Sequence, residues 1–341
     1  MKKIAVLSIL FGIVLFSCRD DFDWKGGLWS PREKYRAEDY PRLVKRAGED
    51  FRILQFSDTH INTYYDDFDT LKNTFRMMGD AIRGQEPDLL VFTGDNVGNL
   101  FNSHWAWQLI SFLDSFAIPY ALVMGNHDGD FLEIQDSNQQ HIIAEIFSRG
   151  TYSLFEKGPD NVTGTGNYGL HIVNESGAII YALILLDSNN DYIHRDQVEW
   201  YEWYLRGLSG AAEPLSGGAV KSLLFFHIPL PEIRDIRREM EQNNFVDDDG
   251  RSAGAAFGEN PTVQSENAGL FSAIKNLKST THLFFGHDHL NTLNYRYQGV
   301  YFVYGLKSGY CAYHDPERLG VTLITLSGDP PAVKVRHCLL K

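Results

Sequence analysis

Five apolar runs, each followed at once by Asp, Asn or His, constrain the fold of this chain more than any other feature. They end in Phe56-Ser57-Asp58-Thr59-His60, Thr93-Gly94-Asp95-Asn96, Met124-Gly125-Asn126-His127-Asp128, Phe225-Phe226-His227-Ile228-Pro229 and Phe284-Phe285-Gly286-His287-Asp288-His289. Short apolar runs bounded by Gly and polar residues are typical of buried strands. Because loops at the carboxyl ends of strands in an α/β sheet meet in one crevice, we expect these polar side chains to converge.

The rest of the chain alternates in the same way. Strand-like runs cover 51–57, 88–93, 120–124, 179–186, 222–226 and 282–285, and helical spacing covers 70–83, 105–116 and 195–208. Alternating strands and helices require crossover connections, so we expect an α/β fold with a largely parallel region, stacked sheets and flanking helices. The tail from 292 to 335 favours antiparallel strands. The stretch 231–264 is charged and rich in Gly and Ala, which favours a long loop near the site.

The first residues indicate export. Lys2 and Lys3 precede an apolar run over 4–16, which is shorter than a membrane-spanning helix and typical of a signal peptide. The run ends at Cys18 in a sequence that resembles a bacterial lipobox, and the acidic residues after it resemble the surface-export signal of bacterial lipoproteins. We therefore expect a lipoprotein signal peptide over 1–17, a tether over 18–48 and a domain over 49–341. The alternative is a plain secretory signal.

Charge limits the partners that this chain can bind. The 341 residues carry 44 acids and 31 bases, a formal charge of −13, which argues against nonspecific binding to nucleic acid or anionic lipid. An acidic surface also repels phosphorylated molecules, so a phosphate site would need local positive charge, which metal ions could supply. Beyond Cys18 the cysteines are Cys311 and Cys338, which could form one bridge or remain as two thiols.

The five polar blocks have the composition and spacing of a metal site. Asp58 and His60 are two residues apart, so both can face one side of an extended stretch, and His287 and His289 repeat this arrangement. The Gly before Asp95, Asn126 and His287 allows a sharp turn and a close backbone approach. Carboxylate, imidazole and amide ligands together suit Mn, Zn, Fe or similar ions rather than a thiolate site.

The blocks D-x-H, G-D-x-x, G-N-H-[DE], H-x-P and G-H-x-H, present in this order from Asp58 to His289, resemble the signature of the calcineurin-like metallophosphoesterase superfamily. Their wording (FSDTH, FTGDN, FFHIPLPE, FFGHDH) is similar to a subgroup related to purple acid phosphatases. The resemblance implies a four-layer αββα sandwich of two mixed β-sheets flanked by helices. One departure is that purple enzymes have a Tyr ligand where this chain has Gly98, and lack the equivalent of His60. We therefore expect no purple colour.

The resemblance also implies a role for each residue. Asp58, His60 and His289 would bind one metal, Asn126, His227 and His287 the other, and Asp95 would bridge the two. His127 would lie over the phosphate as electrostatic stabiliser or general acid, and Asp128 would orient it. Asn96 would contact substrate or support a ligand, although a turn role fits equally well. Asp288 is expected to point away from the metals.

Weaker candidates surround this set. Asp187 could cap a strand or support a ligand. His194 could reach the site, although a structural role is favoured. The aromatic residues Tyr64, Tyr65, Trp105 and Trp107 could line the pocket or belong to the ordinary core and surface.

The expected reaction is hydrolysis of a phosphate ester by a hydroxide that two metal ions activate, with His127 as proton donor. The cofactors would be two divalent or trivalent ions of Mn, Fe, Zn or Mg. Phosphomonoesters are the favoured substrates, and diester or nucleotide cleavage is the alternative. A non-catalytic surface-binding protein is the competing class. The expected partners are a small or phosphorylated substrate and, through a lipid on Cys18, a membrane. The expected location is the bacterial cell envelope, at the outer membrane.

Overall fold

The computed structural model describes residues 27–62, 66–98, 101–131, 134–135, 137–211 and 220–340. Its larger sheet has the strand order β1-β7-β8-β9-β10-β12-β11. These strands are β1 (Arg42–Val44), β7 (Tyr168–Val173), β8 (Ile179–Leu185), β9 (Lys221–Phe225), β10 (Thr280–Phe285), β11 (Asn294–Tyr297) and β12 (Val300–Tyr304). The run β8-β9-β10-β12 is parallel, whereas β7 and β11 pair antiparallel with their neighbours β8 and β12.

The second sheet has the order β14-β13-β2-β3-β4. Its strands are β2 (Phe51–Phe56), β3 (Leu89–Thr93), β4 (Tyr120–Val123), β13 (Gly320–Ser327) and β14 (Ala332–Leu339). The first three run parallel, and β13 and β14 add an antiparallel edge, as expected for the tail. A short hairpin pairs β5 (Asp130–Phe131) with β6 (Ile134–Gln135). Both main sheets are therefore mixed.

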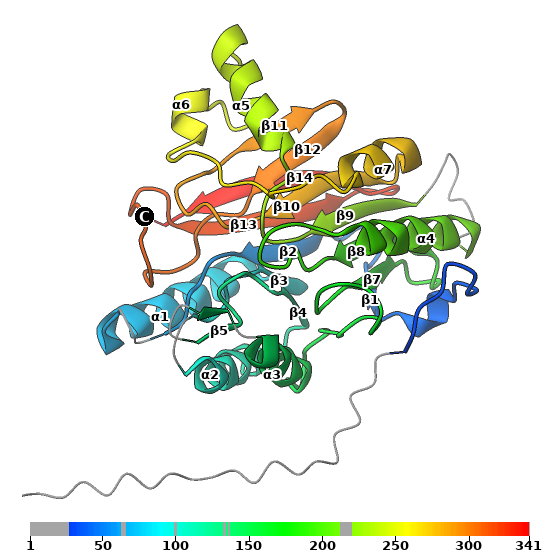
Figure 1. The fold of residues 1–341 in the computed structure, drawn as a ribbon, viewed down its shortest axis with the longest axis horizontal. Helices are drawn as coiled ribbons and strands as arrows, with labels where there is room; N and C mark the ends of the chain where they lie inside the picture. The colour runs from blue at the N-terminus through cyan, green and yellow to red at the C-terminus, as the bar shows by residue number, and fades with distance from the viewer. Residues whose placement is uncertain are drawn as a thin grey trace, which may run out of the picture.

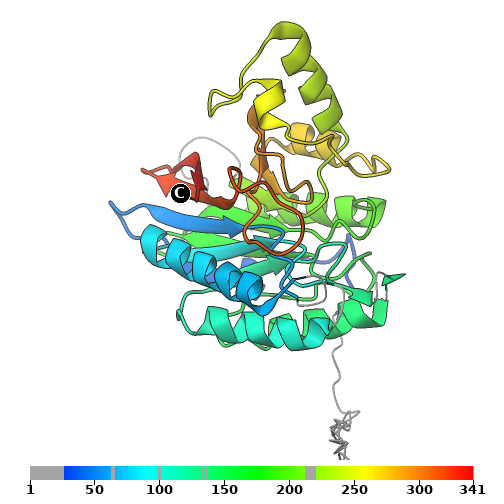
Figure 2. The ribbon, with the colours of Figure 1, turned by 90° about the vertical axis from the view of Figure 1, so that its left-hand side faces the viewer.

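Helices cover the outer faces of the two sheets, so the molecule has four layers (Figures 1 and 2). On the side of β2, β3 and β4 lie α1 (Phe68–Gln85), α2 (Asn102–Asp114) and α3 (Ser137–Ser148). On the side of the larger sheet lie α4 (Arg195–Ala211), α5 (Glu232–Asn243), α6 (Ala253–Ala256) and α7 (Leu270–Leu277). The expected αββα sandwich is confirmed.

Alternation along β8 shows why two apolar layers form. Leu183 and Leu185 pack into the core shared with the second sheet, whereas Ala182 and Ile184 pack into the cluster beneath α4. Successive side chains of a strand point to opposite faces, so a strand that is apolar at every position must be covered on both. The long apolar runs of the sequence are therefore explained by strands that are buried on both faces.

Two expectations about individual segments are corrected. The stretch 231–264 is not a plain loop, because α5 and α6 lie within it, and Ile233, Ile236 and Met240 bury one helical face. Residues 27–48 do not form a free tether: Trp29 and Tyr35 are buried, and β1 pairs in parallel with β7. Residues 1–26, with the expected signal peptide and Cys18, lie outside the described residues. Among the described residues, no helix is long and apolar enough to cross a membrane.

Candidate metal centre

Two groups of potential ligands meet where strands from both sheets end. The first consists of Asp58, His60 and His289, and the second of Asp95, His227 and His287. Within each group, one ligand atom of every residue lies within 4.8 Å of the others. Because β2 and β3 belong to one sheet and β9 and β10 to the other, the centre forms only when the two sheets stack.

The groups are joined through Asp95. Its Oδ2 lies 3.4 Å from His60 Nε2 and 3.1 Å from His227 Nε2, so one carboxylate oxygen faces both groups. The Oδ1 of Asn126 lies 3.1 Å from the same His227 nitrogen, which adds an amide oxygen to the second group. The arrangement has the form expected of a dinuclear centre with a bridging carboxylate.

Hydrogen bonds outside the centre turn the imidazoles toward it. His227 Nδ1 donates to the carbonyl of Thr93 at 2.8 Å, and His289 Nδ1 donates to the carbonyl of Tyr313 at 2.8 Å. A donated Nδ1–H leaves the Nε2 lone pair free, and this is how proteins orient metal-binding histidines. His60 and His289 accordingly present their Nε2 atoms to one another at 3.0 Å. Converging lone pairs beside carboxylates fit a pair of metal ions.

Glycines let the ligand-bearing turns approach one another. A Cβ on Gly125 would lie 2.1 Å from the backbone nitrogen of Asp95, and one on Gly286 would lie 2.5 Å from a carboxylate oxygen of Asp58. Gly94 has a φ of +90°, and its Cβ would lie 2.5 Å from His227 Nδ1. The glycines before the ligands are therefore a steric requirement of the centre. The ligands Asp58, His60, Asp95 and His287 also adopt positive φ, which costs energy in a non-glycine residue.

Burial gives the metal-free centre unusual electrostatics. Burial lowers the pKa of His287 to about 3 and lowers the pKa of His60, so these rings are neutral and ready to ligate. Burial also opposes protonation of His227, but the carboxylates of Asp95 and Asp58 outweigh it and raise its pKa to about 10. Metal ions at the centre would replace this proton as the counter-charge of the carboxylates.

His127 is held by a residue other than the one expected. Its Nδ1 lies 2.5 Å from Asp130 Oδ2, and its side chain is 47% exposed toward the cleft. Asp95 and the Asp130 hydrogen bond raise the pKa of His127 to about 9, against burial, so the ring is protonated at neutral pH. The expectation that Asp128 orients His127 is corrected. Asp130, three residues after His127 and near the start of the short β5–β6 hairpin, takes that position.

Asp128 has a different task. Its carboxylate accepts hydrogen bonds from the backbone nitrogens of Asn96, Val97 and Gly125 at 2.7 to 2.9 Å. It therefore fastens the turn after β4 to the turn after β3. The side chain of Asn96 is fully buried and donates to Asp128 and to the carbonyl of Val123, so it lies behind the centre rather than against a substrate.

Lys307 is a part of the centre that the sequence interpretation missed. It is 1% exposed, and its ammonium donates to the carbonyl of Asp58. Burial lowers its pKa to about 8. The signal for it resembles that of the known blocks, because Lys307 follows the apolar strand β12 after Gly305 and Leu306. A buried cation beside three carboxylate-bearing turns offsets part of their charge.

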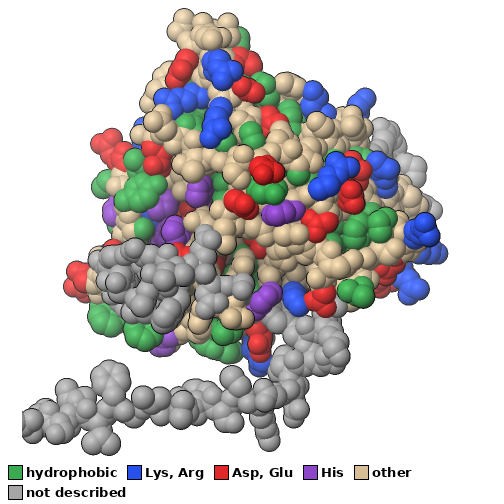
Figure 3. Space-filling model, viewed as in Figure 1, with side chains coloured by type: hydrophobic (Ala, Val, Ile, Leu, Met, Phe, Trp, Pro, Cys, Tyr) green, Lys and Arg blue, Asp and Glu red, His purple; other side chains and the backbone are tan. Residues whose placement is uncertain are grey.

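The centre lies at the base of a cleft of about 570 Å³. Its lining comprises His60, Asn62, Asp66, Asp95, Gly98, His127, Asp130, Thr262, His287, Asp288, His289, Ala312 and Tyr313. Histidine side chains gather at the left of the face that Figure 3 shows. A Cβ on Gly98 would lie 3.5 Å from His60 Nδ1, so the position of the missing Tyr adjoins the ring of His60. Asp288 is turned aside, as expected, and accepts from Tyr304 Oη at 2.6 Å.

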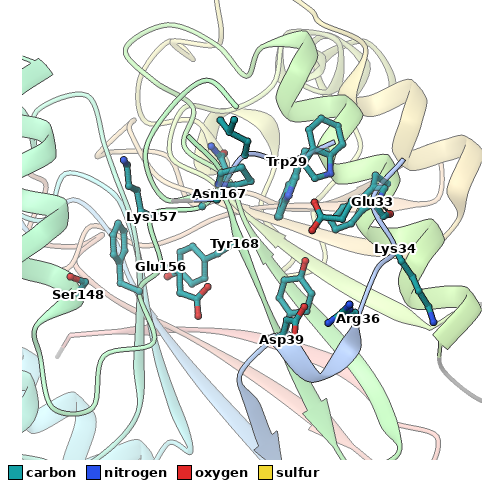
Figure 4. A pocket seen from close by; sticks show the side chains of 18 residues that line it. Trp29, Glu33, Lys34, Arg36, Asp39, Ser148, Glu156, Lys157, Asn167 and Tyr168 are labelled. Atoms are coloured by element: carbon teal, nitrogen blue, oxygen red, sulfur yellow. Dashed lines mark hydrogen bonds between the residues drawn. The ribbon is translucent and has the colours of Figure 1, made fainter. Parts of the chain in front are cut away.

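The weaker candidates lie elsewhere. Trp105 is buried, Trp107 is 44% exposed and His194 stacks on Tyr192, and none of the three lines the cleft. Tyr64 and Tyr65 lie outside the described residues. Buried Asp187 accepts from the backbone nitrogens of Thr165 and Asn189, a structural role. Cys311 and Cys338 are free thiols. A second cavity, of about 450 Å³, separates the N-terminal segment from Glu156, Lys157 and Tyr168 and contains none of the predicted ligands (Figure 4).

The fold and the site together define a hydrolase of the dinuclear-metal class. The family model for calcineurin-like phosphoesterases matches residues 51–291, and the chain belongs to this family. It is accordingly a metal-dependent hydrolase of phosphoric esters. The expected family membership is confirmed.

Three known proteins show how far the likeness extends. An Arabidopsis thaliana protein named "Probable inactive purple acid phosphatase 28" is 27% identical over 83% of this chain and 77% of its own length. Phosphatase DCR2 of Saccharomyces cerevisiae is 26% identical over 73% of this chain and 46% of its own. The crystal structure of a dimetal phosphatase from Danio rerio has a TM-score of 0.44 and 11% identity, covering 81% of this chain and 95% of that one.

Proposed function

We propose that this protein is a phosphomonoesterase that works at two metal ions held by Asp58, His60, Asp95, Asn126, His227, His287 and His289. The observation that carries the proposal is the meeting of two ligand groups at Asp95, at the base of a cleft that His127 overlooks. When bound, the two ions would polarise the phosphoryl oxygens and lower the pKa of an attacking water.

The residues of the chain supply the rest of the chemistry. Protonated His127 faces the cleft and is placed to neutralise a phosphoryl oxygen and to give its proton to the departing alcohol. Asp130 fixes the ring through Nδ1, which leaves Nε2 for the substrate. A monoester dianion carries more charge than a diester, and so gains more from this added cation.

The names of some relatives raise a second possibility, a protein that kept the fold without activity. Every ligand of the family signature is present here, and the ligand atoms converge. A protein that no longer held metal would have no need to keep four ligand residues in the strained positive-φ conformation.

The test combines elemental analysis with two substrates. The purified protein should hold two metal ions per chain and hydrolyse 4-nitrophenyl phosphate faster than bis(4-nitrophenyl) phosphate. An Asp95→Asn variant should lose metal and lower kcat/KM by at least about a hundredfold, since it breaks both sites. Asp80→Asn is the matched control, because Asp80 is exposed on α1, where it pairs with Arg83. Faster diester cleavage would establish the alternative substrate class, and a metal-free wild type would end the enzyme proposal.

We also propose that the protein is exported and anchored by a lipid on Cys18, on the strength of the charged start, the apolar run and the Cys that ends it. Cells fed a radiolabelled fatty acid should label the wild type and the Cys338→Ser control, but not Cys18→Ser. Equal labelling of both variants would contradict the anchor. We propose that nucleic acids are not partners of this protein, because its formal charge of −13 opposes binding to a polyanion.

A further inference from the structure

One wall of the cleft comes from the loop that joins β12 to β13 and is fixed at several points. The carbonyl of Tyr313 accepts from His289 Nδ1 at 2.8 Å, and the Tyr313 ring stacks on the His289 ring with centroids 4.1 Å apart. The Tyr313 hydroxyl donates to both carboxylate oxygens of Glu259, at 3.1 and 3.3 Å. Tyr313 is nevertheless 55% exposed. An aromatic ring is therefore held in one position beside a metal ligand, with much of its surface open.

A second feature of the same cleft is a carboxylate. Asp66 lines the same cleft, and its Oδ2 accepts from the backbone nitrogen of Ala312, the neighbour of Tyr313, at 3.1 Å. Because Ala312 has a φ of +59°, the loop turns sharply at this point. Asp66 is not a member of either ligand group. Its charge is thus available to a molecule that enters the cleft.

The lining of the cleft is one-sided in charge. No Lys or Arg occurs among its described residues, whereas Asp66, Asp95, Asp130 and Asp288 do. Lys307, which interacts with Asp66, is buried and does not line the cleft, so a leaving group with further phosphates or carboxylates would meet Asp66 and no Lys or Arg of the described lining. A positively charged leaving group would find both a carboxylate and an aromatic face, the combination that recognises ammonium groups in proteins.

We propose that Tyr313 and Asp66 select phosphate monoesters whose alcohol carries a cationic amine, such as choline phosphate or ethanolamine phosphate. The inference rests on the proposed phosphomonoesterase activity. The reaction is hydrolysis: water adds to phosphorus, the bond from phosphorus to the ester oxygen breaks, and the alcohol leaves with one proton. Because the Tyr313 ring stacks on His289 of the metal centre and also lines the cleft, an ammonium a few bonds from the ester oxygen would meet this ring.

The test compares two substrates of the same shape on the metal-loaded full chain. Choline phosphate and 3,3-dimethylbutyl phosphate differ in the charge of one atom, so the ratio of their kcat/KM values isolates charge recognition. The wild type should favour choline phosphate by about tenfold or more, the size expected for an ammonium on a ring beside a carboxylate. Asp66→Asn and Tyr313→Leu should each reduce this ratio severalfold.

Two variants make the result specific. Tyr313→Phe keeps the ring and should keep the ratio, which separates the ring from the Glu259 hydrogen bond. Asp69→Asn is the matched control for charge, because Asp69 is exposed in the first turn of α1 and does not line the cleft. Free choline should inhibit 4-nitrophenyl phosphate hydrolysis more strongly than 3,3-dimethylbutanol does, and this difference should shrink in Tyr313→Leu.

The possible failures can be told apart. If 4-nitrophenyl phosphate is hydrolysed in a metal-dependent way but the wild-type ratio is near one, the proposed function stands and the substrate class is wrong. If the wild type favours choline phosphate but Asp66→Asn leaves the ratio unchanged, the role given to Asp66 is wrong. If a nucleotide or pyrophosphate proves the better substrate, the substrate class is wrong. If the metal-loaded protein hydrolyses no phosphomonoester, the proposed function fails and this inference fails with it.

Discussion

Replacing Gly125 by Ala is expected to disable the metal centre by adding a single methyl group. The new Cβ would lie 2.1 Å from the backbone nitrogen of Asp95 and 2.3 Å from its Oδ1, where contacts below 3.0 Å essentially never occur. The turn after β4 and the turn after β3 would therefore have to separate by about 1 Å, a displacement that can cost on the order of a hundredfold in rate at an active site. Overpacking of this kind also destabilises by about 1–3 kcal/mol.

Three measurements follow this change. Gly125→Ala should contain less than two metal ions per chain, should lose about a hundredfold or more in kcat/KM for 4-nitrophenyl phosphate, and should unfold at lower urea in its metal-free form. Gly254→Ala is the matched control, since a Cβ there meets nothing within 4 Å and the residue lies in α6. A Gly125→Ala enzyme with two metals and wild-type kcat/KM would refute the claim that close packing of these turns builds the centre.

Four further outcomes are expected. Lys307→Met should lower the free energy of unfolding by about 1.5–3 kcal/mol, the worth of a hydrogen bond from a charged donor, whereas Lys334→Met on the exposed β14 should not change it. Asp130→Asn should lower kcat about tenfold or more with metal content unchanged, because it loosens His127, and a loss of metal would contradict that role. Burial lowers the pKa of His171 to about 4, so as the pH falls the unfolded chain takes up a proton at this residue before the folded chain does. The free energy of unfolding should therefore be highest above pH 6.5 and fall by about 3 kcal/mol toward pH 4. His171→Gln should reduce this fall when unfolding is followed in urea at several pH values. Removal of the metals by a chelator should abolish activity. It should also lower the free energy of unfolding by about 4 kcal/mol for each site, where the free metal concentration had been a thousandfold above Kd. A melting temperature that the chelator does not change would show that the metals do not stabilise the fold.

The sequence alone determined the class of fold and the seven expected metal ligands. Strands that are apolar on both faces must be buried on both, and polar residues that follow such strands must emerge at a sheet edge. These local rules predict that the polar blocks converge, and the resemblance of the blocks to the family signature supplied the expected ligands Asp58, His60, Asp95, Asn126, His227, His287 and His289.

Tertiary structure decided which side chains support those ligands. Asp128 adjoins His127 in the chain, yet it points to the turn after β3, and Asp130 reaches His127 through the turn between them. Asp66 and Ala312 are 246 residues apart and meet only because the segment before α1 and the β12–β13 loop border the same cleft. Such contacts depend on the stacking of two sheets, which no local pattern encodes. The expected metal ligands of this protein can therefore be predicted from its sequence, whereas the wall that would select a substrate forms only in the folded chain.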